Sequence, residues 1–341
     1  MDRVSQAVKE LVEEIQRMPE APDPAETDRH AFTLLLSGIA ACRRAPGIPC
    51  HMGYRTLYRC GDEPASEELK AHLFRLYGIY DRESLEKVCM EQFTSGREYE
   101  QFMTFWCDAP LFDLEELEEG RRAFETRFKR ASLFRPYVGE RGFYAWDINE
   151  RIGLGRLACA CGIIDRETFD ELTDYQVRKA QVFYHTFKDY AVSCICGAVY
   201  DVPGGDEEDM LSFLDLNKKL ALHLLEEGGA WYRNAWYTPE KREWVSLLPH
   251  NGGCIVSKQI EEGRAIGYMY RDSRPSEQWA DTGWRFFAGD ESDEYSRNPD
   301  NFTIWSLNDI CNLDATILGY AEAKEGSAFG RNAKGEWQRE R

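Results

Sequence analysis

The feature of this sequence that most constrains its fold is a change in hydrophobic periodicity at Gly228-Gly229. Before these glycines, apolar residues recur every three to four positions, which is typical of helices that bury one face. The last such segment, residues 206–227, starts with three carboxylates and stops at the two glycines, as expected for a helix with a favourable dipole and a defined end. After them, apolar and polar residues alternate, which is typical of strands. We therefore expect an α+β chain: an N-terminal all-α domain and a smaller C-terminal α+β domain built on a mainly antiparallel sheet.

The same patterns divide the chain into three parts. Residues 1–26 are an N-terminal helix and a proline-containing linker, residues 27–228 a helical domain, and residues 229–341 the α+β domain. A chain of 341 residues is long enough for two hydrophobic cores. We expect continuous helices over 28–42 and 175–199, a hairpin over 230–248, and strands at 253–258, 264–271, 283–288 and 302–305.

The helical domain contains an internal repeat. Residues 76–85 (LYGIYDRESL) and residues 160–169 (ACGIIDRETF) carry identical or similar residues at most positions. Each copy has a glycine that can end one helix in the left-handed conformation, then two apolar residues, then an aspartate that can cap the next helix. The repeat predicts two similar helical corners, although glycine and aspartate are also the usual residues at unrelated corners.

The charge of the chain limits the kinds of partner it can bind. A net charge of -18 and a pI near 4.9 disfavour nucleic acid and anionic membranes, which would repel such a surface. A basic protein is the natural complement, while the alternative is that the charge only maintains solubility. No run of eighteen apolar residues exists, and the chain opens with a charged amphipathic segment, so we expect a cytoplasmic protein.

The eleven cysteines are an odd number in a long chain and lie in apolar helical stretches. We interpret them as reduced core thiols, not as a disulfide framework. Cys159 and Cys161, like Cys194 and Cys196, are spaced two apart, and such neighbours point about 200° apart on a helix. We therefore expect neither pair to chelate a metal, and we expect no cofactor.

An aromatic strand followed by an acidic loop is the most distinctive stretch of the sequence. The strand begins at Gly283, and the loop begins at Gly289. Aromatic side chains supply most of the energy of many protein interfaces, and surrounding charges set the association rate. The candidate partner-binding residues are Trp284, Phe287, Asp290, Glu291, Asp293, Glu294 and Tyr295, although a place in the core is the stronger expectation for Trp284 and Phe286.

Chemistry at this loop is the main alternative. Asp290, Asp293 or Glu294 could serve a hydrolase, which would require a deep pocket and a perturbed pKa. The same carboxylates with Asp300 could hold a cation, but the regular spacing of a calcium loop is missing. A housekeeping adaptor that binds a cellular protein is a third possibility.

Two resemblances to bacterial families follow from spaced motifs. The run from Gly283 to Tyr295, the Asn-Pro-Asp-Asn-Phe that ends at Phe302, and the motifs at 308–312 and 326–329 resemble an immunity-protein domain of polymorphic toxin systems, over residues 250 to 332. Trp146, Asp147, Gly155, Arg156 and Gly162 are similar to an all-helical bacterial domain of unknown function, over 115 to 225.

The first resemblance implies a non-catalytic protein that neutralises a toxin by direct contact. The partner would be a cognate toxin, basic and encoded nearby, and no catalytic residues come with the likeness. The second resemblance implies no activity. The oligomeric state is left open by the sequence.

Overall fold

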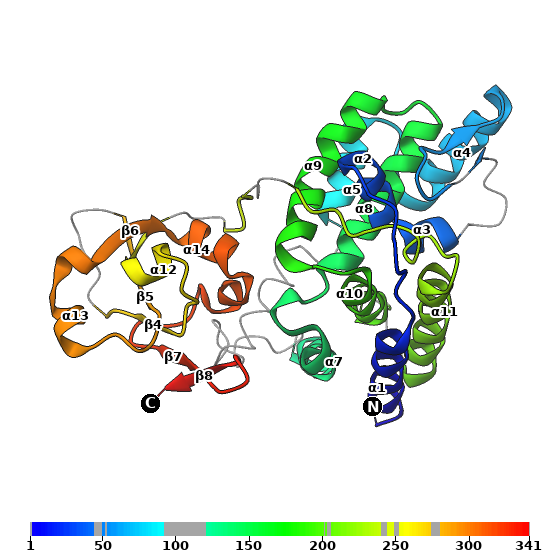
Figure 1. The fold of residues 1–341 in the computed structure, drawn as a ribbon. Helices are drawn as coiled ribbons and strands as arrows, with labels where there is room; N and C mark the ends of the chain where they lie inside the picture. The colour runs from blue at the N-terminus through cyan, green and yellow to red at the C-terminus, as the bar shows by residue number, and fades with distance from the viewer. Residues whose placement is uncertain are drawn as a thin grey trace. The chain divides into compact units, whose positions relative to one another are not determined.

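The computed structural model describes residues 2–43, 50–51, 53–91, 121–200, 202, 206–239, 244–248, 252–273 and 280–340. Contacts between Cα atoms divide them into two compact units, with the described residues up to 239 in a helical unit and those from 244 onward in a second unit (Figure 1). The α+β class and the order of the two parts are confirmed.

The helical unit is assembled around α8 (Tyr144–Ala160), which is buried on nearly every side. Asp147, Asn149 and Arg156 of this helix are as buried as its apolar residues. The other elements of the unit are α1 (Asp2–Arg17), α2 (Arg29–Leu36), α3 (Gly38–Arg43), β1 (Cys50–His51), β2 (Arg59–Cys60), α4 (Glu63–Tyr77), α5 (Arg82–Glu91), α7 (Arg121–Val138), η2 (Gly139–Arg141), α9 (Arg166–Phe183), α10 (Phe187–Tyr200) and α11 (Glu207–Leu225).

The two repeat corners have the expected geometry. Gly78 ends α4 with φ 70°, and Gly162 follows α8 with φ 75°, a left-handed conformation that favours glycine. Asp81 then accepts a hydrogen bond from the Ser84 N–H (2.8 Å) at the start of α5, and Asp165 accepts one from the Thr168 N–H (2.8 Å) at the start of α9.

Two helices that the sequence predicts as continuous are interrupted. The predicted helix 175–199 breaks at Tyr184, which has φ -130° and ψ 151°. Its buried hydroxyl lies 2.7 Å from the Ser193 Oγ, and Thr186 accepts a hydrogen bond from the Asp189 N–H to begin α10. The predicted helix 28–42 breaks at Ser37, whose hydroxyl donates to the Leu34 carbonyl oxygen. At both breaks a Ser or Thr hydroxyl bonds to the local backbone, in competition with the helical hydrogen bonds.

The hairpin expected over 230–248 is not formed in its described residues, 230–239 and 244–248. Residues 229–239 instead pack on the helical unit. The Trp231 ring stacks on Phe187 (5.5 Å, 9°), and its Nε1 donates to the Leu35 carbonyl oxygen (2.9 Å). Contacts therefore place this segment with the helices, whereas the sequence assigned it to the C-terminal domain.

The second unit is a six-stranded sheet in the order β6-β3-β5-β4-β7-β8, in which only β3 and β5 are parallel. Its strands are β3 (Gly253–Ser257), β4 (Tyr268–Arg271), β5 (Asp281–Phe287), β6 (Phe302–Ser306), β7 (Ala328–Arg331) and β8 (Trp337–Glu340). Its helices are α12 (Lys258–Glu261), α13 (Asp293–Arg297), η3 (Pro299–Asn301), α14 (Leu307–Leu313) and η4 (Ala315–Tyr320).

The two faces of this sheet differ. One face carries the core, in which Val256, Met269, Trp284, Phe286 and Phe329 pack against buried residues of α14 and η4. Side chains alternate along a strand, so the neighbours of these residues point to the opposite face. That second face is the one on which half-exposed aromatic rings gather.

Candidate functional site

Five aromatic rings form a cluster on the second face of the sheet, and we call it the aromatic face. Phe287 lies at its centre. Its ring centroid is 5.9 Å from that of Tyr270, on which it stacks, 6.1 Å from that of Tyr268 and 5.5 Å from that of Phe302. Tyr295 extends the cluster through Phe302, at 6.0 Å. All five side chains are half-buried, so each presents part of its ring to solvent.

Strand register brings these residues together from four elements. Tyr268 pairs with Phe287 across β4 and β5, and Phe302 pairs with Ser257 across β6 and β3. Tyr295 comes from α13, and its hydroxyl donates to the Asn301 carbonyl oxygen (3.2 Å). Burial raises the pKa of the Tyr268 and Tyr270 hydroxyls, so both stay protonated and can donate hydrogen bonds to a partner.

Glu291 of the acidic loop has a structural role. Its carboxylate accepts hydrogen bonds from the backbone N–H groups of Ala288 (2.7 Å) and Gly289 (2.8 Å), at the turn that ends β5. Burial alone would raise the pKa of this carboxyl group. The hydrogen bonds from Ala288, Ser257 and Gly289 together lower the pKa by more than burial raises it, so the pKa lies below its ordinary value. Glu291 thus holds the turn in place.

Asp290, Asp293 and Glu294 are exposed. Asp290 forms an ion pair with Arg264 (2.7 Å), and hydrogen bonding from Arg264 lowers the pKa of this carboxyl. Asp293 and Glu294 occupy the first turn of α13, where Ser292 accepts a hydrogen bond from the Tyr295 N–H (3.1 Å). These two carboxylates lie beside the aromatic face and point their charge to solvent.

Trp284 belongs to the core. Its side chain is completely buried, and its Nε1 donates to the Ala321 carbonyl oxygen (3.0 Å). On the opposite face of the same strand, Arg285 is buried in a bidentate ion pair with Asp281, with both distances 2.8 Å. Of the seven residues that the sequence singles out, only Trp284 is buried; Asp290, Asp293 and Glu294 are exposed, and Phe287, Glu291 and Tyr295 are half-buried.

Two of the loop carboxyl groups, Asp290 and Glu291, lack the raised pKa of a general acid. A glycosidase-type site needs one carboxyl group with a raised pKa, whereas the pKa values of both Asp290 and Glu291 are lowered. In the part of the chain that the structure describes, no group of three or more His, Cys, Asp or Glu residues is arranged to hold a metal ion.

Four of the five motif residues of the helical unit are buried, and Gly162 is exposed. Arg156 is fully buried and donates to the carbonyl oxygens of Leu34 (3.2 Å) and Thr56 (2.8 Å) and to the Ser37 hydroxyl (2.8 Å). Its guanidinium group also lies 3.8 Å from the Tyr58 ring centroid. It therefore ties the end of α2 and the loop before β2 to α8.

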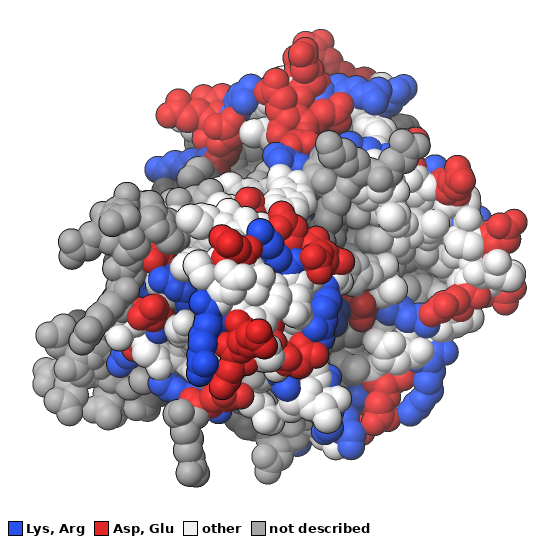
Figure 2. All heavy atoms as spheres, turned by 60° about the vertical axis from the view of Figure 1, so that its left-hand side comes forward, with Lys and Arg blue, Asp and Glu red and all other residues white. Residues whose placement is uncertain are grey.

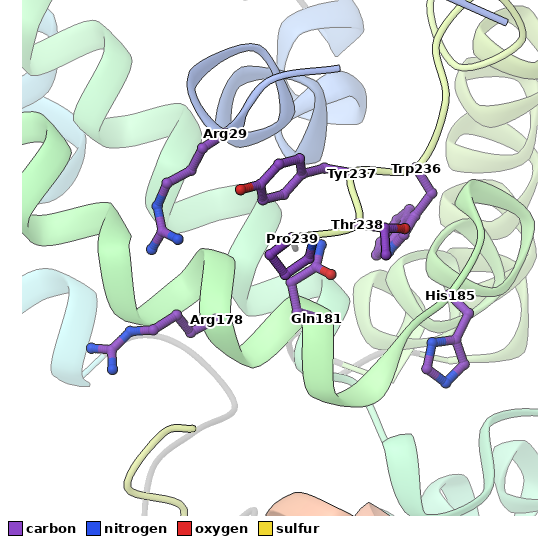
Figure 3. Close-up of a pocket in the computed structure, with 8 residues that line it drawn as sticks. All are labelled: Arg29, Arg178, Gln181, His185, Trp236, Tyr237, Thr238 and Pro239. Atoms are coloured by element: carbon purple, nitrogen blue, oxygen red, sulfur yellow. The ribbon is translucent and has the colours of Figure 1, made fainter. Parts of the chain in front are cut away.

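The helical unit has a cavity of about 280 Å³ beside the segment that follows α11 (Figure 3). The segment after α11 contributes Trp236, Tyr237 and Pro239 to the lining, and Gln181 of α9 and His185 directly after α9 also line the cavity. Arg29 and Arg178 both pair with Asp174 at its edge. Among the described residues that line the cavity there is no thiol and no carboxylate.

The cysteines behave as small apolar residues. Cys194 and Cys196 are buried in α10, and burial raises the pKa of both thiols. Burial also raises the pKa of Cys159 and Cys161 at the end of α8. Such thiols are poor nucleophiles and poor metal ligands.

Charges of both signs are interspersed over the surface shown in Figure 2, with uncharged areas between them. The net charge of -18 is therefore not spread evenly as negative charge over this face. None of the described helices is long and apolar enough to cross a membrane.

Fold and site together define a two-unit α+β protein in which the C-terminal unit carries a half-buried aromatic face bordered by exposed carboxylates. Comparison with known families likewise gives two separate regions. Residues 254–341 match the Immunity protein Imm33 domain, and residues 72–236 match a protein of unknown function family (DUF1266). The chain thus carries an Imm33 immunity domain preceded by a DUF1266 region. No curated protein and no solved structure matches the chain.

Sequence reasoning missed Tyr268, Tyr270 and Phe302 as members of the aromatic face. The alternation of Tyr268 and Tyr270 showed that they share one side of a strand. It did not show that β4 lies next to β5, because strand order depends on contacts between distant segments. Phe302 likewise reaches Phe287 only through the placement of β3 between β6 and β5.

Proposed function

We propose that this protein is an immunity protein that neutralises a bacterial toxin by direct contact through the aromatic face, without catalysis. The observation that carries the proposal is the half-exposed cluster around Phe287 in the unit that matches the immunity domain. Aromatic rings held rigid by a sheet lose little conformational freedom on binding, so they are effective anchors in an interface.

The exposed carboxylates give this surface a preference for a basic partner. Asp293 and Glu294 border the aromatic face, and Asp300 lies in η3 directly before β6. Their field raises the rate of encounter with a positively charged protein, and this advantage falls as salt screens it. The helical unit serves as a scaffold in this proposal, since four of its five motif residues are buried. The protein acts in the cytoplasm, where a toxin would reach its target.

A binding experiment with the toxin domain encoded by the neighbouring gene, inactivated by mutation, tests the proposal. Phe287→Ala and Tyr270→Ala should each weaken binding by at least about ten-fold, which is typical of a truncated aromatic anchor. Co-expression with the active toxin should protect cells with the wild-type protein, and less so with these variants. Toxin that fails to bind the wild-type protein would refute the proposed function.

Charge reversal provides an independent readout with a matched control. Asp293→Lys with Glu294→Lys should slow association by about ten-fold at low salt, within the range of electrostatic steering, and by less at high salt. Glu322→Lys with Glu325→Lys changes the same number of exposed charges away from α13 and should have a smaller effect. Equal effects of the two double variants would show that net charge, and not this surface, guides the partner.

A further inference from the structure

The two edges of the six-stranded sheet are built differently. β8 forms one edge and ends in Gln338, Arg339 and Glu340, which are all exposed. Charged residues on an edge strand discourage pairing with another chain. β6 forms the other edge, and its five residues, Phe-Thr-Ile-Trp-Ser, include no charge and no proline. Ile304 at its centre is 61% exposed. Within the described residues, β6 therefore lacks the charges and the proline that discourage strand addition.

The hydrogen-bond ladder leaves the backbone of Ile304 facing outward. Residues of an antiparallel strand alternate between bonding to the neighbouring strand and pointing away from it. The Leu307 N–H donates to the Gly252 carbonyl oxygen (2.9 Å), which sets the phase of the β3–β6 pair. Thr303 and Trp305 therefore bond to β3, and the N–H and C=O of Ile304 point to the outer edge. No strand in the described part of the chain pairs with that edge.

The side chains of β6 connect this edge to the aromatic face. Ile304 pairs with Ile255, and Phe302 pairs with Ser257, so Ile304 and Phe302 lie on the same side of the sheet as Phe287. A strand added at β6 would place alternate side chains beside Phe302 and Ile304. It would thus extend the surface already proposed to bind the toxin.

Charge favours a basic segment over a second copy of this chain. Asp293, Glu294 and Asp300 are exposed near the start of β6, and Asp309 follows its end. Two copies paired antiparallel through β6 would bring the Asp300 end of one strand to the Asp309 end of the other. A partner strand with Lys or Arg beside Asp300 would instead find opposite charge.

We propose that an extended segment of the toxin adds to the outer edge of β6 as a further strand of the sheet, through backbone hydrogen bonds to Ile304. The segment carries apolar residues at alternate positions and a basic residue at the end beside Asp293, Glu294 and Asp300. This inference rests on the proposed function and specifies how the partner is held.

Hydrogen exchange tests this pairing directly on the unmodified protein. The Ile304 amide should exchange rapidly in the free protein and at least about ten-fold more slowly with the inactivated toxin domain bound, because it then donates to the added strand. The Arg339 amide region on the β8 edge serves as the internal comparison and should change little.

Two variants at one position separate backbone pairing from side-chain contact. Ile304→Pro removes an N–H that does not bond to β3, and proline is tolerated at such edge positions. Ile304→Ala keeps the N–H and loses only the side chain. The proline variant should bind the toxin domain at least about ten-fold more weakly than the alanine variant, with a similar melting temperature. If the proline variant unfolds, the exchange measurement decides alone.

Each other outcome has a distinct meaning. A toxin domain that binds while the Ile304 amide stays unprotected overturns the strand addition and leaves the proposed function intact. A toxin domain that does not bind at all overturns the proposed function itself. A protein that dimerises in analytical ultracentrifugation without toxin, with the Ile304 amide already protected, shows that a second copy occupies this edge and overturns the proposal.

Discussion

Replacing Glu291 tests whether this carboxylate of the acidic loop stabilises the fold, in contrast to the exposed carboxylates that we propose to attract the partner. Glu291→Ala removes two hydrogen bonds from backbone N–H groups to a carboxylate, at 2.7 and 2.8 Å. Hydrogen bonds to charged groups contribute about 1.5–3 kcal/mol each when buried, and this side chain is half-exposed, so we expect a loss of about 1–3 kcal/mol in the free energy of unfolding of the C-terminal unit. Glu294→Ala, at an exposed position of the same loop, should change it by less than about 0.5 kcal/mol.

The pH dependence of this loss follows from the lowered pKa of Glu291. A carboxyl group with a folded pKa below its unfolded value of about 4.3 stabilises the fold fully above that value, and the stabilisation fades as pH falls through the folded pKa. Urea unfolding of the wild type and of Glu291→Ala should therefore differ most above about pH 5 and converge at lower pH. A difference that is absent at pH 7, or that is unchanged at pH 3, would refute the structural role of Glu291.

Three further changes probe the two cores. Gly197→Ala should destabilise the helical unit by about 1–3 kcal/mol in thermal unfolding, because the new Cβ would lie 2.4 Å from the Trp146 Cβ. A variant as stable as the wild type would show that α8 and α10 can move apart. Asp281→Ala leaves Arg285 buried without its bidentate partner and should cost about 3–5 kcal/mol in chemical unfolding, and a near-neutral result would contradict the importance of this pair. Residues 1–243 and 244–341, expressed separately, should each unfold cooperatively, the first with a mainly helical circular dichroism spectrum; a strand-rich first piece would disprove the division.

Periodicity predicted the parts of the fold in which one face of an element is buried. Val4, Val8, Leu11 and Ile15 repeat at helical spacing, and all four are fully buried along α1. A Ser-x-x-Asp sequence at residues 306–309 is a local signal for a helix start, and Ser306 accepts a hydrogen bond from the Asp309 N–H (3.0 Å). Such signals lie within a short segment, so they can be recognised in the sequence without knowing which other segments pack against it.

The errors arose where tertiary packing outweighs local pattern. The alternating aromatics around Trp231 and Trp236 suggested a hairpin, but both rings contact Phe187 of the helical unit instead of a partner strand. Glu291 and Glu294 are indistinguishable in the sequence, and only the turn at Ala288 and Gly289 gives the first a structural role. For the candidate site, the sequence indicated Phe287 and Tyr295, whereas the remaining rings required the strand order.

The anchoring of residues 229–239 bears on how this protein could be recombined in evolution. Trp231 completes the helical unit, and Ala25 and Ala235 are joined by a backbone hydrogen bond of 2.9 Å, so a gene fusion that ended at Gly228 would uncover Phe32 and Phe187. A crossover after residue 239 would instead keep Trp231 and Trp236 with the helical unit. The family matches end at 236 and begin again at 254, which leaves this junction outside both. In an exchange of C-terminal domains at this junction, the helical unit would keep the segment that covers Phe32 and Phe187.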